Sequence, residues 1–226
     1  MPYKILFVTA TLLEAEAIGK ITGIEAIQGG YRLNNTEISI LVAGVGSVST
    51  SWEMQKWLSA NDKPDMAINS GIAGSYMEDI KIGDVVMPST DCFADAGIED
   101  GNNFLTLSEA GLVHANEFPF RGGLIHADQS VTGLLKGLVK PVKAITVNTA
   151  TGSYSTRNKL VQKYNPDIET MEGATFFYIC SREKIPFLAL RSISNMVEIR
   201  NKANWNIKLA ISNLTEKLNE VVLTLT

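Results

Sequence analysis

Lys4–Thr9 reads KILFVT, a short run of apolar and β-branched residues, and the pattern that it begins decides the fold. Runs of this composition and length predict β-strands. Several are apolar at nearly every position, which is typical of strands that are buried on both faces of a parallel sheet. The other runs are Glu37–Ala43, Asp65–Ser70, Gly83–Pro88, Ala144–Val147 and Phe187–Ser192.

Helical patterns alternate with these strands. The clearest is the last, where Ile207, Ile211, Leu214 and Leu218 recur at helical spacing, and Asn204 or an adjacent residue is expected to cap its start. Alternating strands and helices predict an α/β layered fold, which we expect to be a single domain over residues 1–226. The other helices are expected to follow Thr11, Gly46, His126, Ser155 and Met171.

The composition limits the function classes. Of the 226 residues, 45% are hydrophobic and 19% are charged, which is typical of a globular protein, and the net charge of −4 argues against a nucleic-acid partner. Cys92 and Cys180 form no disulfide framework, and His114 and His126 are too isolated for a metal site. Neither a signal-peptide pattern nor a membrane span is evident. We therefore expect a cytoplasmic protein without a metal or other cofactor.

Three glycine-bearing segments follow predicted strands: Ala43–Gly46 (AGVG), Ser70–Ser75 (SGIAGS) and Thr151–Ser153 (TGS). Each is interpreted as a turn, either a plain strand-to-helix connection or a place where the backbone approaches a ligand. No dinucleotide fingerprint and no P-loop motif occurs. Asp91–Gly123 is the least regular region and is expected to be a long functional loop or excursion.

Glu14, Glu172 and Asn195 lie near the predicted carboxyl ends of strands, where open sheets build their sites. Taken singly, Glu14 fits a solvated helix face, Glu172 fits a charge that complements a helix dipole, and Asn195 fits a turn. Taken together, they suit cleavage of an N-glycosidic bond. One carboxylate would activate water, a second would hold the ribose, and a third group would stabilise the departing base.

The chain resembles the nucleoside phosphorylase and nucleosidase superfamily over essentially its whole length. Within it, the order and spacing of the motifs follow those of the methylthioadenosine/S-adenosylhomocysteine nucleosidases. The matching segments are Val8–Glu14, Gly44–Ser47, Ile68–Ser75, Ile82–Pro88, Glu169–Ala174 and Arg191–Asn195.

A narrower resemblance is to the futalosine hydrolases, enzymes that remove hypoxanthine from futalosine in the menaquinone pathway. It depends on Phe93–Gly101, Asn116–Phe120, Glu169–Phe177 and Arg191–Ile207. The resemblance implies a three-layer α/β/α sandwich with a twisted mixed sheet, and a homodimer or higher homo-oligomer. The substrate partner would be a small nucleoside.

The resemblance also implies roles for single residues. Glu14 matches the residue that activates water, and Met171 and Glu172 match the pair that contacts the ribose. Asn195 stands where adenosine-specific nucleosidases carry an aspartate that supports protonation of the base. The remaining matches are Ser194 and Arg191, which would orient that position, and Ala10, Val45, Ala73 and Gly74, which would line the pocket.

One departure concerns the aromatic residue that often stacks on the base in these nucleosidases. Val147–Ser153 has none at the corresponding place, so Phe93 or Phe104 is the expected substitute. The carboxylated tail of futalosine calls for a cation, for which Arg200 and Lys202 are candidates, although exposed basic residues are usually only solvated.

Two chemical arguments select the reaction. Ala10–Ala17 contains Glu14 and Glu16 but no basic residue, so it favours water over phosphate as the nucleophile. Asn195 can donate to O6 and N7 of a 6-oxopurine, which an ionised aspartate cannot do. The predicted enzyme is a 6-oxopurine nucleoside hydrolase. The alternatives are a methylthioadenosine/S-adenosylhomocysteine nucleosidase, a phosphate-dependent phosphorylase and a non-enzymatic purine-binding protein.

Overall fold

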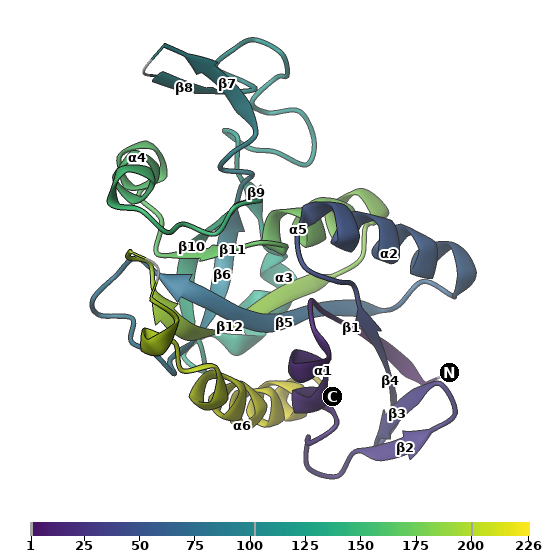
Figure 1. The fold of residues 1–226 in the computed structure, drawn as a ribbon. Helices are drawn as coiled ribbons and strands as arrows, with labels where there is room; N and C mark the ends of the chain where they lie inside the picture. The colour runs from purple at the N-terminus through teal and green to yellow at the C-terminus, as the bar shows by residue number, and fades with distance from the viewer. Residues whose placement is uncertain (1, 102, 200) are drawn as a thin grey trace.

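A ten-stranded mixed sheet forms the centre of the computed structural model, which describes residues 2–101, 103–199 and 201–226 (Figure 1). A separate two-stranded sheet pairs β7 (Gly97–Asp100) with β8 (Asn103–Thr106). In order across the large sheet, the strands are β11 (Ile168–Thr170), β10 (Lys140–Thr146), β6 (Val85–Asp91), β12 (Phe187–Met196), β5 (Met66–Ser75), β1 (Tyr3–Thr9), β4 (Thr36–Val42), β3 (Gly30–Leu33) and β2 (Glu25–Ile27), with β9 (Ile125–His126) paired to β6.

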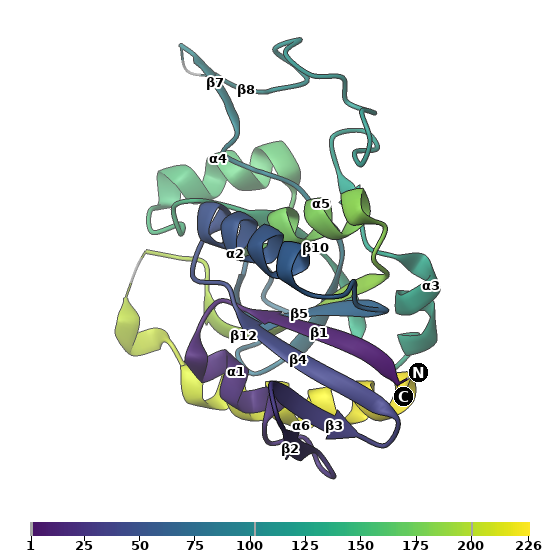
Figure 2. The ribbon, with the colours of Figure 1, turned by 90° about the vertical axis from the view of Figure 1, so that its right-hand side faces the viewer.

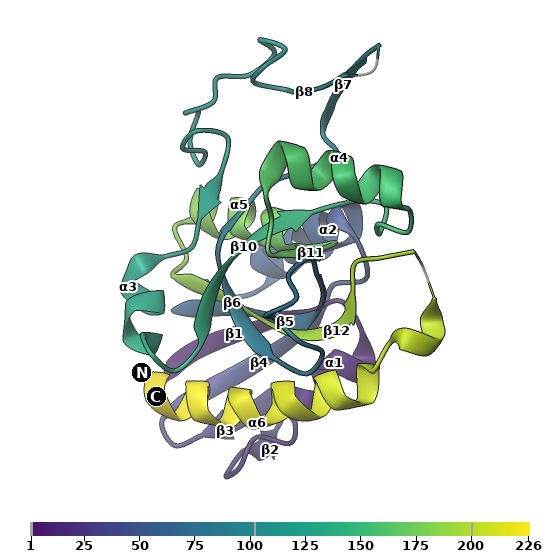
Figure 3. The ribbon, with the colours of Figure 1, turned by 90° about the vertical axis from the view of Figure 1, so that its left-hand side faces the viewer.

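Helices cover both faces of this sheet (Figures 1 and 2). On one face lie α2 (Ser47–Ala60) and α5 (Gly173–Glu183), and on the other lie α1 (Leu12–Ile18) and the long α6 (Ile207–Leu225), which crosses under the sheet in Figure 3. The predicted three-layer α/β/α sandwich is therefore confirmed. The remaining helices are α3 (Gln129–Thr132), α4 (Tyr154–Tyr164) and the 3₁₀ turns η1 (Gly133–Leu135) and η2 (Lys202–Asn204).

The two largest apolar clusters of the described residues lie on opposite faces of the sheet. On the α1 and α6 side, Phe7 and Ile68 pack with Leu214 of α6, and all three side chains are fully buried. On the opposite side, Leu6 and Val8 belong to a second cluster that includes the aromatic side chains of α5. Successive residues of β1 thus face opposite cores, which explains why KILFVT is apolar at nearly every position.

The central strand β5 sets the register of the site. It runs parallel to β12, with Arg191 paired to Gly71 and Ile193 paired to Ala73. The register then shifts by one residue, so that Asn195 pairs with Gly74. On the other side of β5, Glu169 of β11 also pairs with Gly74, in antiparallel orientation. The pairing of β11 with β5 closes a ring of strands through β12, β6 and β10.

The interpretation of Ser70–Ser75 as a turn is wrong, because β5 continues through these residues to Ser75. Their backbone groups are paired with β12, and glycine here leaves room for neighbouring side chains instead of reversing the chain. Ala43–Gly46 is a turn as predicted, with φ of 81° at Gly44 and 91° at Gly46. Only glycine adopts such angles without strain.

The predicted excursion departs from the body of the protein. Between β6 and β9, the hairpin of β7 and β8 stands away from the layered core (Figure 1). The predicted start of the last helix is shifted: its cap is Asn206, which accepts a hydrogen bond from the Leu209 amide at 3.1 Å, and Asn204 lies in η2.

Candidate active site

Glu14 is buried at the start of α1, directly after β1. Together with Thr11 it forms a capping box, in which the Thr11 side chain accepts from the Glu14 amide and the carboxylate returns to the Thr11 amide at 2.8 Å. The carboxylate also accepts from the Ala10 amide at 3.1 Å and from the Thr11 hydroxyl at 2.9 Å. The local sequence TLLE therefore fixes both the helix start and the direction of this carboxylate.

The second oxygen of Glu14 points at β5. Oε1 accepts from the Ile72 amide at 3.1 Å, and a Cβ placed on Gly71 would lie 2.6 Å from it. Glycine at position 71 is thus required for the carboxylate to reach the strand. Three donors converge on Oε2 and one on Oε1, so Oε1 is the oxygen with room to accept from another group, such as a water molecule.

Glu172 stands at the boundary between β11 and α5 and is 9% exposed. Its Oε1 accepts from the Gly46 amide at 2.9 Å, which joins the turn after β4 to the start of α5. Burial raises the pKa of the Glu172 carboxyl, and the Gly46 amide and the guanidinium of Arg191 oppose that rise. The other carboxylate oxygen remains available to a ligand.

Arg191 supplies the buried positive charge of this region. Its side chain is 2% exposed, and its guanidinium donates to the carbonyl oxygens of Asn69 (2.8 Å) and Leu190 (3.0 Å) and to the Asn69 side chain. Burial lowers the pKa of Arg191, while the carboxylates of Glu172 and Glu14, followed by Asp91, raise it. One cation therefore offsets several buried carboxyl groups.

The side-chain amide of Asn195 is held in one orientation. The Ser194 hydroxyl lies 2.8 Å from Asn195 Oδ1 and 3.2 Å from the Ala73 carbonyl, while Asn195 Nδ2 donates to the Met196 carbonyl at 3.0 Å. Gly74 leaves space beside the amide, since a Cβ there would lie 3.2 Å from Nδ2. The second N–H of the amide is free to donate to a ligand.

The other predicted pocket residues surround these groups. Ala10 contributes its amide to Glu14, and Val45 is exposed between the two glycines of the turn that binds Glu172. Ala73 and Gly74 lie in β5 beside Asn195, and Met171 directly precedes Glu172. Arg200 lies outside the described residues, and Lys202 is exposed in η2.

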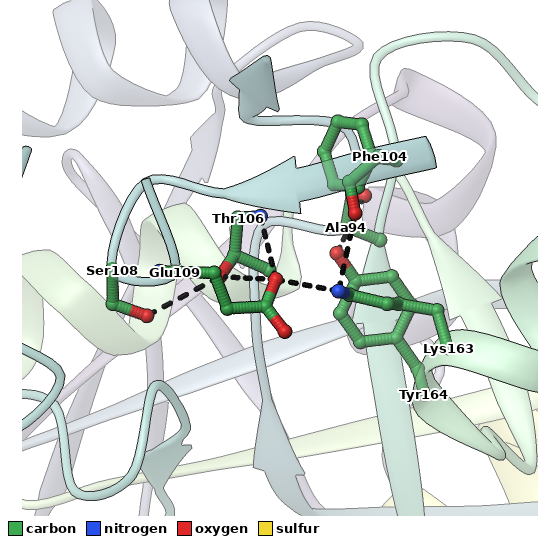
Figure 4. A network of polar contacts seen from close by, with 7 residues as sticks. All are labelled: Ala94, Phe104, Thr106, Ser108, Glu109, Lys163 and Tyr164. Atoms are coloured by element: carbon green, nitrogen blue, oxygen red, sulfur yellow. Dashed lines mark hydrogen bonds and ion pairs between the residues drawn. The ribbon is translucent and has the colours of Figure 1, made fainter. Parts of the chain in front are cut away.

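Phe93 and Phe104 lie in different parts of the excursion. Phe93 packs against the core on the α5 side, whereas Phe104 lies in β8. A cavity of about 400 Å³ lies beside Phe93, with Leu107, Val113 and Tyr164 in its wall. At its edge, the network of Figure 4 ties the excursion to α4.

The key contact of that network is between Lys163 Nζ and Glu109 Oε2, at 2.5 Å. Lys163 also donates to the Phe104 carbonyl at 3.1 Å. The bond to Lys163, with those from Thr106, lowers the pKa of Glu109 to about 2.

Sequence reasoning missed Asp91, a fully buried carboxyl at the end of β6. Its Oδ1 accepts from the Cys92 amide at 2.8 Å and from the Thr146 hydroxyl at 3.0 Å, and its Oδ2 has no hydrogen-bond partner. Burial raises the pKa of Asp91 to about 7. Nothing in the sequence distinguishes it from the turn-forming aspartates that commonly follow strands.

This raised pKa predicts how stability depends on pH. Between its ordinary value near 4 and about 7, the folded protein holds a proton on Asp91 that the unfolded chain has lost. The free energy of unfolding should therefore fall as pH rises through this window, by about 3 kcal/mol between pH 5 and pH 8 from this group. In Asp91→Asn that contribution should vanish, which urea unfolding of both proteins at pH 5 and pH 8 would show. An equal change in the free energy of unfolding between the two pH values in both proteins would contradict this prediction.

Comparison with known proteins identifies the family of the chain. The family model of the phosphorylase superfamily matches residues 1–226. A futalosine hydrolase of Streptomyces coelicolor is 27% identical, over 96% of this chain and 94% of its own. A 5′-methylthioadenosine/S-adenosylhomocysteine nucleosidase of Buchnera aphidicola is also 27% identical, over 91% and 86%. Both relatives are N-glycosyl hydrolases.

Among solved structures, the futalosine hydrolase of Helicobacter pylori strain 26695 superposes with a TM-score of 0.80 at 19% identity, covering 97% of each chain. This likeness shows that the fold is shared over nearly the whole length. With the family match, it leads to one conclusion: the chain belongs to the phosphorylase superfamily.

Proposed function

We propose that this member of the superfamily hydrolyses the N-glycosidic bond of a 6-oxopurine nucleoside, and that the nucleoside is futalosine, from which it releases hypoxanthine in menaquinone biosynthesis. The observation that carries the proposal is the pair of buried carboxylates, Glu14 and Glu172, whose charges act on the buried guanidinium of Arg191. The full-length similarity to a futalosine hydrolase supports the choice of substrate.

Glu14 acts on water in this proposal. Its carboxylate is held by the backbone amides of Ala10, Thr11 and Ile72, and Oε1 retains room for one more donor. A water molecule bound there would lose its proton to Glu14 as it attacks the anomeric carbon of the ribose. The rigid setting matters because a general base must lie within hydrogen-bond reach of that proton.

Glu172 binds the ribose hydroxyls. The Gly46 amide holds Oε1, which leaves Oε2 to accept from the ribose hydroxyls. As the glycosidic bond breaks, positive charge develops on the sugar, and a buried carboxylate stabilises it strongly because little water screens the interaction. Met171 would pack against the same sugar.

Water is favoured over phosphate as the nucleophile because, among the residues that the structure describes, the buried cation of the site is already engaged. The guanidinium of Arg191 donates to Asn69 and Leu190. The carboxylates of Glu172 and Glu14 are close enough to raise its pKa. A phosphate dianion between these carboxylates would be repelled. Incubation of the protein with futalosine, inosine and methylthioadenosine, with and without phosphate, followed by chromatography of the released base, tests reaction and substrate together. Release of adenine alone, or a requirement for phosphate, would overturn the proposal.

The main alternative substrate is methylthioadenosine or S-adenosylhomocysteine, given the nucleosidase relative. The amide of Asn195 favours a 6-oxopurine. Its Oδ1 is occupied by Ser194, and its free N–H can donate to O6 or N7 as negative charge builds on the leaving base.

Asn195→Asp should therefore lower kcat/KM for futalosine at least about tenfold, since an acceptor-only carboxylate would face acceptor atoms and leave them unpaired, at about 1–3 kcal/mol. The loss should shrink toward pH 5, where the new carboxyl is partly protonated, and it should vanish or reverse for the 6-amino analogue with the same 5′ group. The measurement is kcat/KM for both substrates in both proteins. An unchanged ratio would mean that Asn195 does not read the base.

We further propose that the enzyme is a cytoplasmic homodimer. Val48 and Trp52 are one turn apart on α2 and are 82% and 69% exposed, and Val45 precedes them beside the Glu172 turn. An apolar strip of this kind is typical of a surface that another copy covers. Both cysteines are buried and free, as expected in a reducing compartment. Among the described residues, no helix is long and apolar enough to cross a membrane.

A further inference from the structure

The start of α5 is capped in an unusual way. Glu172 occupies the N-cap position, yet its side chain accepts no hydrogen bond from its own helix and reaches the Gly46 amide instead. An N-cap side chain ordinarily accepts from one of the first helical amides, because these have no partner within the helix. At α5, other residues must satisfy these amides if the carboxylate is to remain free.

Two threonines from neighbouring strands meet this need. The Gly173 amide donates to Thr170 Oγ1 at 3.2 Å, and the Ala174 amide donates to Thr146 Oγ1 at 2.7 Å. Both hydroxyls are almost completely buried and lie 3.3 Å apart. They come from the ends of β11 and β10, so the sheet itself caps the helix.

Asp91 determines how the Thr146 hydroxyl is oriented. A hydroxyl has one proton, and that of Thr146 is directed to Asp91 Oδ1 at 3.0 Å, which leaves the oxygen lone pairs for the Ala174 amide. Asp91 Oδ1 is itself fixed by the Cys92 amide. The contact is close: a Cβ on Gly173 would overlap Asp91 Oδ2, so only glycine fits between the carboxyl and the helix start.

We propose that Asp91, Thr146 and Thr170 are positioning residues, which cap α5 in place of Glu172 and thereby keep its carboxylate on the ribose. The proposal rests on the ribose-binding role of Glu172 given above. Without these hydroxyls, the Gly173 and Ala174 amides would lose their acceptors, and the side chain of Glu172, at the N-cap position, is the kind of acceptor that ordinarily caps a helix. It would turn back onto its own helix and release the sugar.

Thr146→Val tests this, because it keeps the shape of the side chain and removes the hydroxyl. The readout is the ratio of kcat/KM for futalosine to kcat/KM for its 2′-deoxy analogue. This ratio measures how much the interaction of Glu172 with the ribose hydroxyls contributes to the reaction. We expect this ratio to fall roughly tenfold, the scale of one hydrogen bond to a charged group. Thr146→Ser should retain the wild-type ratio, because it restores the hydroxyl, and Asp91→Asn should retain most of it, because Oδ1 can still accept.

Thr175→Val is the matched control. Thr175 lies on α5, is buried, and its hydroxyl has no hydrogen-bond partner, so its loss should leave the ratio unchanged. Thr170→Val provides a second test if Thr146→Val does not fold, which circular dichroism will show. A wild-type ratio in folded Thr146→Val or folded Thr170→Val would overturn the inference. A wild-type enzyme that cleaves both substrates equally would instead refute the role of Glu172.

Discussion

Glu172→Ala is expected to be folded and nearly inactive, with kcat for futalosine reduced by about 100- to 1000-fold or more. The substitution removes the carboxylate that would stabilise the developing charge on the sugar, and losses of this size follow the removal of a single preorganised electrostatic group. It also leaves the Gly46 amide without its acceptor and Arg191 with less negative charge nearby. Some loss of stability should therefore accompany the loss of turnover.

Single-turnover kinetics with saturating futalosine measure this effect separately from binding. A matched control is Glu183→Gln, at the opposite and exposed end of the same helix, which should retain full activity. In the wild type, a 2′-deoxy substrate should react poorly because it lacks one of the hydroxyls that Glu172 would bind. Turnover of Glu172→Ala within tenfold of the wild type would remove this residue from the mechanism.

Glu14→Gln is expected to bind substrate normally and to lose about 100-fold or more in kcat, the usual size of a general-base effect. The variant should fold, because glutamine also serves in a capping box, and one amide oxygen can accept from the Ala10 and Thr11 groups. The amide nitrogen then takes the place of Oε1, beside the Ile72 N–H. A donor therefore stands where the acceptor for water was.

Glu16 is a suitable control because it lies two residues after Glu14 in the same helix and is exposed. Glu16→Gln changes the net charge by the same amount and should leave kcat and KM unchanged. Measurement of kcat and KM for both variants separates a local chemical role from a general effect of charge. Equal activity in the two variants would exclude Glu14 as the base.

Much of the fold followed from local patterns. The strand that begins at Phe187 and the helix that begins after Glu172 were predicted because apolar runs of the right length and period leave few alternatives. The error at Ser70–Ser75 has a physical reason: glycine is frequent in turns, but here β12 and β11 flank the strand and their side chains need the space. Tertiary pairing overrode the local preference.

The candidate site was predictable only where a motif carried it. Glu14, Glu172 and Asn195 lie within short matching segments, whereas the buried Asp91 lies at the start of the irregular excursion and has no local signature. Its environment is created by Thr146 and Gly173, which are distant along the chain. Long-range proximity of this kind follows from the strand order, which the sequence pattern does not specify.

The one-residue register shift between Ile193 and Asn195 has a consequence for the evolution of the enzyme. In an unshifted strand, Asn195 would pair with Ser75; the extra residue places it opposite Gly74, through backbone geometry that depends little on the identity of its side chain. An amide and a carboxylate can therefore occupy the same place without repacking. Because asparagine and aspartate codons differ by a single base, preference for one purine over another could change in one mutational step while the sugar-cleaving machinery stays intact.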